Sequence, residues 1–376
     1  MAGLARPGTA GRGGARRGSA RQARLGWARR GKARLGMAGM AGRGPAWQGR
    51  AGRGKAWQAR QGMERTEVDM ENAEHLLFGI DLFGDTIKPK SSGVLAEKFT
   101  MPPFTILDAR SGFWRERKRA WLSCGLASEL GRKKDLLRMS KNITETKKIL
   151  NSSVFDPVLA ELAYRWFSPE GGQIVDPFAG GSVRGIVAGA LGRSYWGCDL
   201  RPEQVAANEM QLDTIATAVR PIWVCGDSME TLRESPEADM VLSCPPYGDL
   251  EKYSDDPRDL STMDWHAFVA AYKRIILRTV SRMKSDTFAC WVVGDFRDKR
   301  GFYRNFVSIT IDAFEQCNAH LYNEAILATS LVTAGMRAGL MFKRSRKLTK
   351  VHQNVLVFCK GDWRKAAAKC GDIGYD

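Results

Sequence analysis

Three aspartates follow apolar, strand-like runs at a spacing that could form one ligand site: Asp176, Asp199 and Asp227. The first opens the segment DPFAGGS, in which Gly180 and Gly181 would let a ligand approach the backbone where the next helix begins. The second lies 23 residues later, an offset at which a carboxylate commonly accepts hydrogen bonds from ribose hydroxyls. These residue types and spacings indicate binding of a ribose-containing ligand.

Other common ligand-binding patterns are absent from the sequence. Neither G-x-G-x-x-G nor G-x-x-x-x-G-K-[ST] occurs, so the usual dinucleotide and P-loop fingerprints are missing. The four histidines have no metal-ligand spacing, and the eight cysteines form no C-x-x-C pair. The sequence therefore predicts no metal site and no disulfide framework.

The elements that must position the three acids alternate between strand and helix from residue 151 onward. We predict strands at 173–178, 195–199, 222–227, 238–244 and 287–296, and helices at 157–167, 183–191, 202–217 and 264–283. Such alternation is typical of a parallel sheet with helices on both faces, whose ligands lie beyond the carboxyl ends of the strands. The three acids should therefore converge on one crevice.

The segment DPFAGGSVRGIVAGALGRSYWGCDL, followed by CGD and then by SCPPYGDL, carries a family resemblance. It resembles S-adenosylmethionine-dependent amino-methyltransferases of nucleic acids, in particular phage and bacterial DNA N6-adenine and N4-cytosine methylases. The resemblance covers residues 151–360. It implies the α/β class I methyltransferase fold, which is a Rossmann-like, mostly parallel seven-stranded sheet with helices on both faces. Its final antiparallel strand is expected at 351–361.

The resemblance also implies S-adenosylmethionine as the cofactor. Its contacts would come from six residues of the motifs: Asp176, Phe178, Gly180, Gly181, Asp199 and Asp227. The first acid and the glycine turn would line the methionine part, and Phe178 would pack beside the cofactor or the target base. Asp199 would hold the ribose, and Asp227 would accept a hydrogen bond from the adenine amino group.

In this family the CPPY segment holds the target base. An exocyclic amine is a poor nucleophile because its lone pair is conjugated with the ring, and acceptors on its N–H groups help the nitrogen to rehybridise. Pro245 and Pro246 would fix the backbone so that the carbonyl of Pro245 points at the amine. Tyr247 would stack on a base flipped out of duplex DNA.

Cys244 departs from the family, in which Asp, Asn or Ser is usual at this position. A thiol accepts hydrogen bonds weakly, and strand alternation would point the neighbouring Ser243 the other way. Cys244 could instead act as a nucleophile, as in C5-cytosine methylases, but those enzymes carry a Pro-Cys order. We favour a structural cysteine that is tolerated beside the catalytic prolines.

The positive charge of the chain is concentrated at its beginning. Residues 1–62 carry 15 of the 58 basic residues and no acid, which leaves 43 basic against 41 acidic residues elsewhere. This tail is rich in Gly, Ala and Arg, and it repeats AGRGPAWQGR as AGRGKAWQAR, a composition that predicts disorder. Translation upstream of a true start at Met63 is the favoured interpretation, with an arginine-rich nucleic-acid arm as the alternative.

Two further regions follow from the sequence. Residues 63–150 are predicted to be an accessory region that could contact DNA, and residues 151–376 the catalytic domain. Within the first, 104–119 reads either as a duplex-facing surface or as an amphipathic helix with a solvated basic face. The acidic loop 248–263 reads either as a lid or as a solvated loop. Target recognition is expected from 63–150, 248–263 or 337–350.

The expected activity is methyl transfer to a base amine in DNA, with adenine N6 favoured and cytosine N4 second. An RNA amino-methyltransferase and a non-catalytic DNA-binding protein with the same fold are the alternatives. No apolar run is long enough for a membrane helix, and the cysteine usage fits a reducing compartment. We expect a soluble protein in the cytoplasm of a bacterium or of a phage-infected host.

Overall fold

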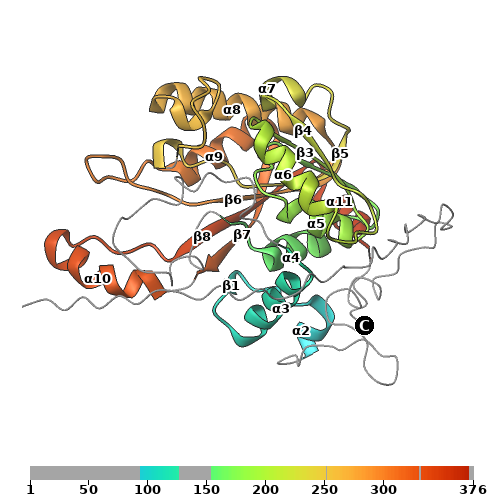
Figure 1. Cartoon of the computed structure of the whole chain (residues 1–376), viewed down its shortest axis with the longest axis horizontal. Coiled ribbons are helices and arrows are strands. Elements are labelled where there is room, and N and C mark those ends of the chain that lie inside the picture. The colour runs from blue at the N-terminus through green and yellow to red at the C-terminus, as the bar shows by residue number, and fades with distance from the viewer. Residues whose placement is uncertain (1–93, 127–153, 251, 330–331, 372–376) are drawn as a thin grey trace, which may run out of the picture. The chain divides into compact units, whose positions relative to one another are not determined.

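The computed structural model describes residues 94–126, 154–250, 252–329 and 332–371, all within the compact unit Glu64–Asp376 (Figure 1). The predicted tail at 1–62 lies outside the described residues. The strands are β1 (Ile106–Asp108), β2 (Gln173–Asp176), β3 (Ser194–Asp199), β4 (Ile222–Cys225), β5 (Ala238–Ser243), β6 (Met283–Val293), β7 (Ala319–Ala328) and β8 (His352–Lys360). The α-helices are α2 (Val94–Phe99), α3 (Gly112–Ser123), α4 (Pro157–Phe167), α5 (Val183–Ala190), α6 (Pro202–Leu212), α7 (Ser228–Thr231), α8 (Trp265–Arg282), α9 (Phe306–Glu315), α10 (Val332–Ser345) and α11 (Trp363–Lys369).

The eight strands form one sheet in the order β1-β7-β8-β6-β5-β2-β3-β4. All pairings are parallel except those of β8, which runs antiparallel to both β6 and β7. The seven strands from β4 to β7 have the order of the class I methyltransferase fold, in which the last strand is inserted antiparallel. The predicted fold and the predicted antiparallel strand at 351–361 are confirmed, and β1 adds an eighth strand beside β7.

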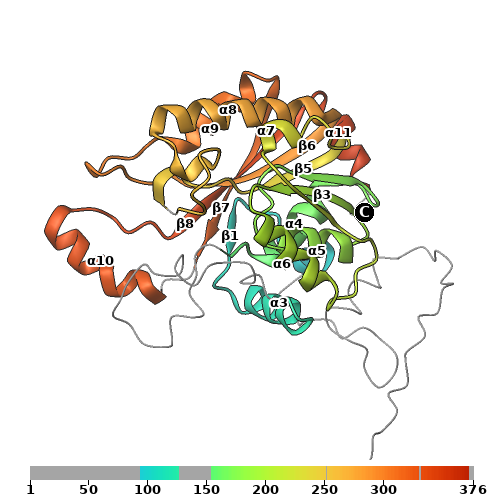
Figure 2. The ribbon, with the colours of Figure 1, turned by 45° about the horizontal axis from the view of Figure 1, so that its top comes forward.

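Helices cover both faces of the sheet. Alternate side chains of β6 belong to the two cores that result. Phe288, Cys290 and Val292 belong to one buried cluster together with residues of α3, α4 and α5. The residues between them, such as Trp291, belong to a second cluster with residues of α8 and α9. Figure 2 shows these helix sets on opposite sides of the strands. Because both faces are buried, the strand reads as a continuous apolar run.

The described part of the predicted accessory region, residues 94–126, belongs to the same sheet and core as the residues that follow 154. Strand β1 pairs with β7, and α3 packs on α4 through the buried Trp114 and Trp121. Arg117, which the amphipathic interpretation places on a solvated face, is also buried. A strand from before residue 151 therefore completes the sheet, while the division into an accessory region and a catalytic domain stays a prediction.

The contact between α3 and α4 is organised by a buried carboxylate, that of Glu161. It accepts hydrogen bonds from Arg117 Nε at 2.7 Å, Trp121 Nε1 at 2.9 Å and Arg165 Nε at 3.0 Å. Burial alone would raise its pKa, but the two arginine charges and these bonds outweigh burial and lower it to about 2. The ion pair is therefore fully formed at neutral pH.

Capping aspartates precede two of the predicted helices. Asp156 caps α4 by accepting a hydrogen bond from Val158 N at 3.0 Å, with Pro157 at the first helical position. Asp264 likewise caps α8. Within the described part of the chain, no helix has the length and apolarity that a membrane span requires.

Replacing Glu161 with Gln tests the carboxylate between α3 and α4. The change leaves Arg117 buried without its counter-charge, so unfolding should become easier by about 3–5 kcal/mol, roughly 6–15 °C in Tm. Because the folded-state pKa is depressed, the advantage of the wild type is full above the ordinary carboxyl pKa and declines as the pH falls toward about 2. Thermal melts at several pH values measure it.

The matched control is Glu209→Gln, which breaks the exposed pair between Glu209 and Arg220. Exposed pairs contribute about 0–1 kcal/mol, so this variant should melt close to the wild type. Equal melting of the two variants would contradict a stabilising contact at Glu161.

Candidate active site

Polar residues that could contact a ligand lie at the carboxyl ends of three neighbouring strands. Strand β2 lies between β3 and β5, so the turn after β2 has the end of β3 on one side and the end of β5 on the other. Asp176 ends β2, Asp199 ends β3 and Ser243 ends β5. The sheet therefore brings the glycine turn and the CPPY segment to one edge, as the sequence predicted.

Asp176 is fully buried and is surrounded by donors from the protein itself. Oδ2 accepts from Arg184 Nε at 2.6 Å and from Tyr195 Oη at 2.8 Å, while Oδ1 accepts from Ser243 Oγ at 2.6 Å and from Phe178 N at 3.1 Å. These four bonds leave no exposed oxygen for a ligand. The structure thus gives Asp176 a positioning role in place of the predicted cofactor contact.

The turn after β2 is held in a conformation that glycine adopts readily. Gly180 has φ +50°, its N–H donates to Asp199 Oδ2 at 3.1 Å, and its carbonyl accepts from Asn208 Nδ2 at 2.8 Å. Gly181 lies beside it and is half-buried. The turn is therefore fixed from both sides, by Asp199 and by Asn208.

Asp199 contacts this turn from the end of β3, with 14% of its side chain exposed. Oδ2 takes the Gly180 N–H, and Oδ1 accepts from Arg201 N at 2.9 Å. Burial raises the pKa of this carboxyl, and the Arg201 charge together with the backbone bonds opposes that rise only in part. A partly desolvated carboxylate of this kind is stabilised by further donors such as ribose hydroxyls.

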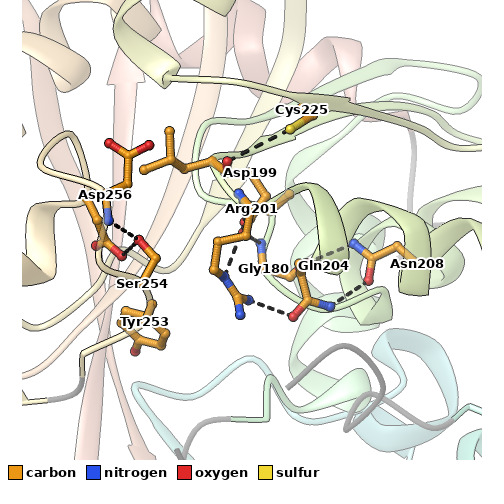
Figure 3. Close-up of polar contacts among 12 residues, drawn as sticks. Gly180, Asp199, Arg201, Gln204, Asn208, Cys225, Tyr253, Ser254 and Asp256 are labelled. Carbon is orange, nitrogen blue, oxygen red and sulfur yellow. Dashed lines mark hydrogen bonds and ion pairs between the residues drawn. The ribbon is translucent and has the colours of Figure 1, made fainter. Parts of the chain in front are cut away.

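A polar network of Arg201, which caps α6, and of two residues on α6 contacts the turn, as Figure 3 shows. Arg201 Nη2 donates to Gln204 Oε1 at 2.7 Å, and Gln204 Nε2 donates to Asn208 Oδ1 at 3.0 Å. Asn208 then holds the carbonyl of Gly180. All three network residues are buried, and Arg201 Nη1 has no partner among the described residues.

The sequence reasoning missed these residues, although a signal was present. Gln204, Asn208 and Gln211 recur at helical spacing on one face of α6, where an ordinary helix would carry apolar side chains against the sheet. A buried polar stripe at this spacing indicates that the helix supports something other than a core.

Asp227 differs in detail from its prediction. Strand β4 ends at Cys225, and Asp227 is the N-cap of α7, where Oδ1 accepts from Met229 N at 2.9 Å. It is therefore not the end of a strand. The residue is half-buried, and no other described side chain donates to its second oxygen, which remains available to an amino group.

The CPPY segment leaves β5 and enters an aromatic cluster. The Tyr247 ring meets Phe296 and Phe306 edge-on, with centroids 6.1 and 6.0 Å away. Its hydroxyl accepts from Gln353 Nε2 at 2.9 Å and forms a hydrogen bond with Cys244. Burial raises the pKa of this hydroxyl well above its ordinary value. Pro245 is buried, Pro246 is half-buried, and no described residue donates to the carbonyl of Pro245.

Ser243 and Phe178 complete this part of the edge. Ser243 points back to Asp176, as strand alternation predicted, so it cannot replace Cys244 as an acceptor. Phe178 is half-buried and stacks on Tyr272 with centroids 6.5 Å apart. Its remaining surface lies beside the turn.

The loop 248–263 is anchored over the edge. Asp259 accepts from Ser261 N at 2.8 Å and from Ser254 Oγ at 2.8 Å, and Leu260 is buried. Figure 3 places Ser254 opposite the Asp199 network, and the charge of Asp259 contributes to the raised pKa of Asp199. Residues 259–261 are therefore buried against the fold, while Lys252, Asp255 and Arg258 are exposed, and the lid stays a prediction.

Comparisons with known proteins find only distantly similar structures. No family model matches the chain, and no curated protein matches it. Among solved structures, TrmN from Thermus thermophilus is 15% identical with a TM-score of 0.37, covering 55% of this chain and 49% of its own. The chain thus spans about half the length of TrmN.

Two other solved structures have similar scores. Magnesium protoporphyrin IX methyltransferase ChlM from Synechocystis PCC 6803, with bound SAM, is 10% identical with a TM-score of 0.38, covering 60% of this chain and 89% of its own. A TehB-like SAM-dependent methyltransferase from Corynebacterium glutamicum ATCC 13032 is 15% identical with a TM-score of 0.35, covering 57% and 92%. The fold assignment rests on the strand order described above.

Asp199 provides the test of the cofactor side. Asp199→Ala removes a charge-assisted acceptor worth about 1.5–3 kcal/mol, so the affinity for S-adenosylmethionine should fall at least about tenfold in calorimetry. Because burial raises the pKa of Asp199, acidification should weaken binding from a higher pH than an ordinary aspartate would allow. That pH dependence should be lost in Asp199→Asn.

The control is Asp213→Ala, an exposed carboxylate at the other end of α6. It should bind the cofactor as the wild type does. Unchanged affinity in Asp199→Ala would place the ribose elsewhere.

Proposed function

We propose that this chain transfers a methyl group from S-adenosylmethionine to an exocyclic amine of a base in DNA, with adenine N6 favoured over cytosine N4. The observation that carries the proposal is the 2.6 Å bond from Ser243 to Asp176. It ties the end of β5, where the CPPY segment begins, to the end of β2, where the glycine turn begins. A methyl donor in the turn and a base amine at the prolines would be neighbours.

The cofactor side fits S-adenosylmethionine in its donors and acceptors. Asp199 offers its remaining lone pairs to the ribose hydroxyls, and Gly180 and Gly181 leave room for the methionine part. Asp227 offers its second oxygen to the adenine amino group. The orphaned Nη1 of Arg201 is a further buried donor in the network that holds the turn.

The substrate side supplies orientation and acceptors. S-adenosylmethionine brings an electrophilic methyl group when it is bound. The carbonyl of Pro245 accepts a hydrogen bond from the base amine and thereby helps its nitrogen to become pyramidal. Tyr247 forms a platform for the base, and the bonds from Gln353 and Cys244 hold its ring in place.

In this mechanism Cys244 is a hydrogen-bonding partner of the Tyr247 hydroxyl. Gln353 donates to the tyrosine oxygen, so the hydroxyl proton is left for the sulfur of Cys244. This contact supports the structural interpretation of the cysteine. A C5-cytosine mechanism would need the same sulfur to attack the base.

Product analysis tests the proposal. Duplex DNA incubated with enzyme and S-adenosylmethionine, digested to nucleosides and analysed by mass spectrometry, should contain N6-methyladenine, or N4-methylcytosine as the second expectation. The product 5-methylcytosine would contradict the amine mechanism. Transfer to RNA alone would contradict the DNA substrate and favour an RNA amino-methyltransferase.

Two variants separate the contributions of the CPPY residues. Tyr247→Ala removes a stacking platform worth about 1–3 kcal/mol, so kcat/KM should fall roughly 5- to 150-fold. Cys244→Ser keeps a hydrogen-bonding partner for Tyr247 and should retain activity within about threefold. Cys317→Ser, at a half-buried thiol after α9, is the matched control. Complete loss of turnover in Cys244→Ser alone would indicate a nucleophilic cysteine.

A further inference from the structure

A pocket of about 420 Å³ opens directly beyond the CPPY segment. Gly248, the residue after Tyr247, contributes to its wall. Met263, Trp265 and Phe268 provide an apolar wall, and five charged residues complete the lining: Asp264, Asp298, Lys299, Arg300 and Arg304. The pocket belongs to the loop between β6 and α9 and to the start of α8, neither of which the cofactor contacts use.

Other side chains already cover the faces of the Trp265 ring in this pocket wall. The Arg304 guanidinium lies over the Trp265 ring, 4.5 Å from its centroid. Phe268 stacks on the same indole with centroids 5.3 Å apart and the planes 16° from parallel. Trp265 therefore holds Arg304 in place and has little ring surface left for a nucleobase.

The charges of the pocket leave an excess of positive donors. The acids are satisfied within the protein, since Asp264 caps the amino end of α8 and Asp298 pairs with Arg300 at 3.0 Å. Arg304 Nε is buried and has no hydrogen-bond partner among the described residues. Lys299 is exposed, and no described acid pairs with it.

Further cations lie along the same loop. The Nζ of Lys347 lies against Gly301, and the Lys350 side chain lies against Gly294. Both lysines come from the segment between α10 and β8, which ends at the carboxyl edge of the sheet where β8 begins. Lys347 and Lys350 therefore add two cations beside the loop that lines the pocket.

We infer that this pocket binds a phosphate of the polynucleotide backbone next to the target base, with Arg304 and Lys299 as its ligands. The inference rests on the proposed function for the identity of the polymer. A guanidinium with free N–H groups suits two phosphate oxygens at once, and a contact to the backbone beside an extruded base holds it in the flipped state. The occupied faces of Trp265 favour an anion over a second stacked base.

The test compares two arginines that each lie over a tryptophan ring. Arg304→Gln removes the proposed ligand, and Arg364→Gln removes an arginine that lies 4.4 Å over Trp363 on α11, after β8 has returned to the opposite edge of the sheet. Binding of duplex DNA is measured at several salt concentrations, together with KM for methyl transfer. Arg304→Gln should weaken DNA binding about tenfold and lower the salt slope by about one. Arg364→Gln should change neither.

Two further measurements keep the result interpretable. Arg304→Lys retains the charge, so it should restore the salt slope while leaving part of the affinity loss, because lysine does not form the two-pronged contact. Affinity for S-adenosylmethionine and Tm should stay at wild-type values in Arg304→Gln. A salt slope for Arg304→Gln equal to that of Arg364→Gln would overturn the phosphate site.

The outcome also distinguishes this inference from the proposed function. A wild-type protein that methylates DNA, with an Arg304→Gln variant of unchanged salt slope and KM, refutes the phosphate site and leaves the function intact. A wild-type protein that methylates no nucleic acid but loses DNA binding in Arg304→Gln refutes the function and supports the site.

Discussion

The buried carboxylate of Asp176 is the interaction on which the rest of the site depends. A charge without access to water is tolerated only when donors surround it, and here the side-chain donors come from α5, β3 and β5. The bonds from Tyr195 and Ser243 tie the two strands beside β2 to the end of β2. The glycine turn and the CPPY segment obtain their relative placement from this one residue, although it offers nothing to a ligand.

The carboxyl edge of the sheet has two halves, and different kinds of interaction hold the residues of each half in place. On the side of β3, hydrogen bonds run from Arg201 through Gln204 and Asn208 to the turn, so the placement there is polar and directional. On the side of β5, placement comes from aromatic packing around Tyr247 and Phe306. Polar bonds suit a cofactor with many hydrogen-bonding groups, and flat rings suit a base. The two halves meet at the bond between Ser243 and Asp176.

The sequence predicted most of the sheet because its central strands are buried on both faces and read as apolar runs. Strand β7 was missed, since AHLYNEAILA mixes exposed polar residues with apolar ones and runs on toward α10. The role of Asp176 could also not be predicted from the sequence. Spacing places an acid at a strand end but does not say which way it points, and its partners Arg184, Tyr195 and Ser243 lie 8, 19 and 67 positions away.

The antiparallel strand β8 has a consequence for the order in which the protein is built. It lies between β6 and β7, and β7 in turn pairs with β1. Strands β7 and β1 can therefore join the sheet only after β8, which the ribosome makes later. Gln353, which holds the Tyr247 hydroxyl, lies at the start of the same strand. Contacts between such distant parts of a chain form slowly because long loops must close first. A nascent chain can therefore assemble its glycine turn early, but the Tyr247 ring is fixed by Gln353 only when the last strand inserts.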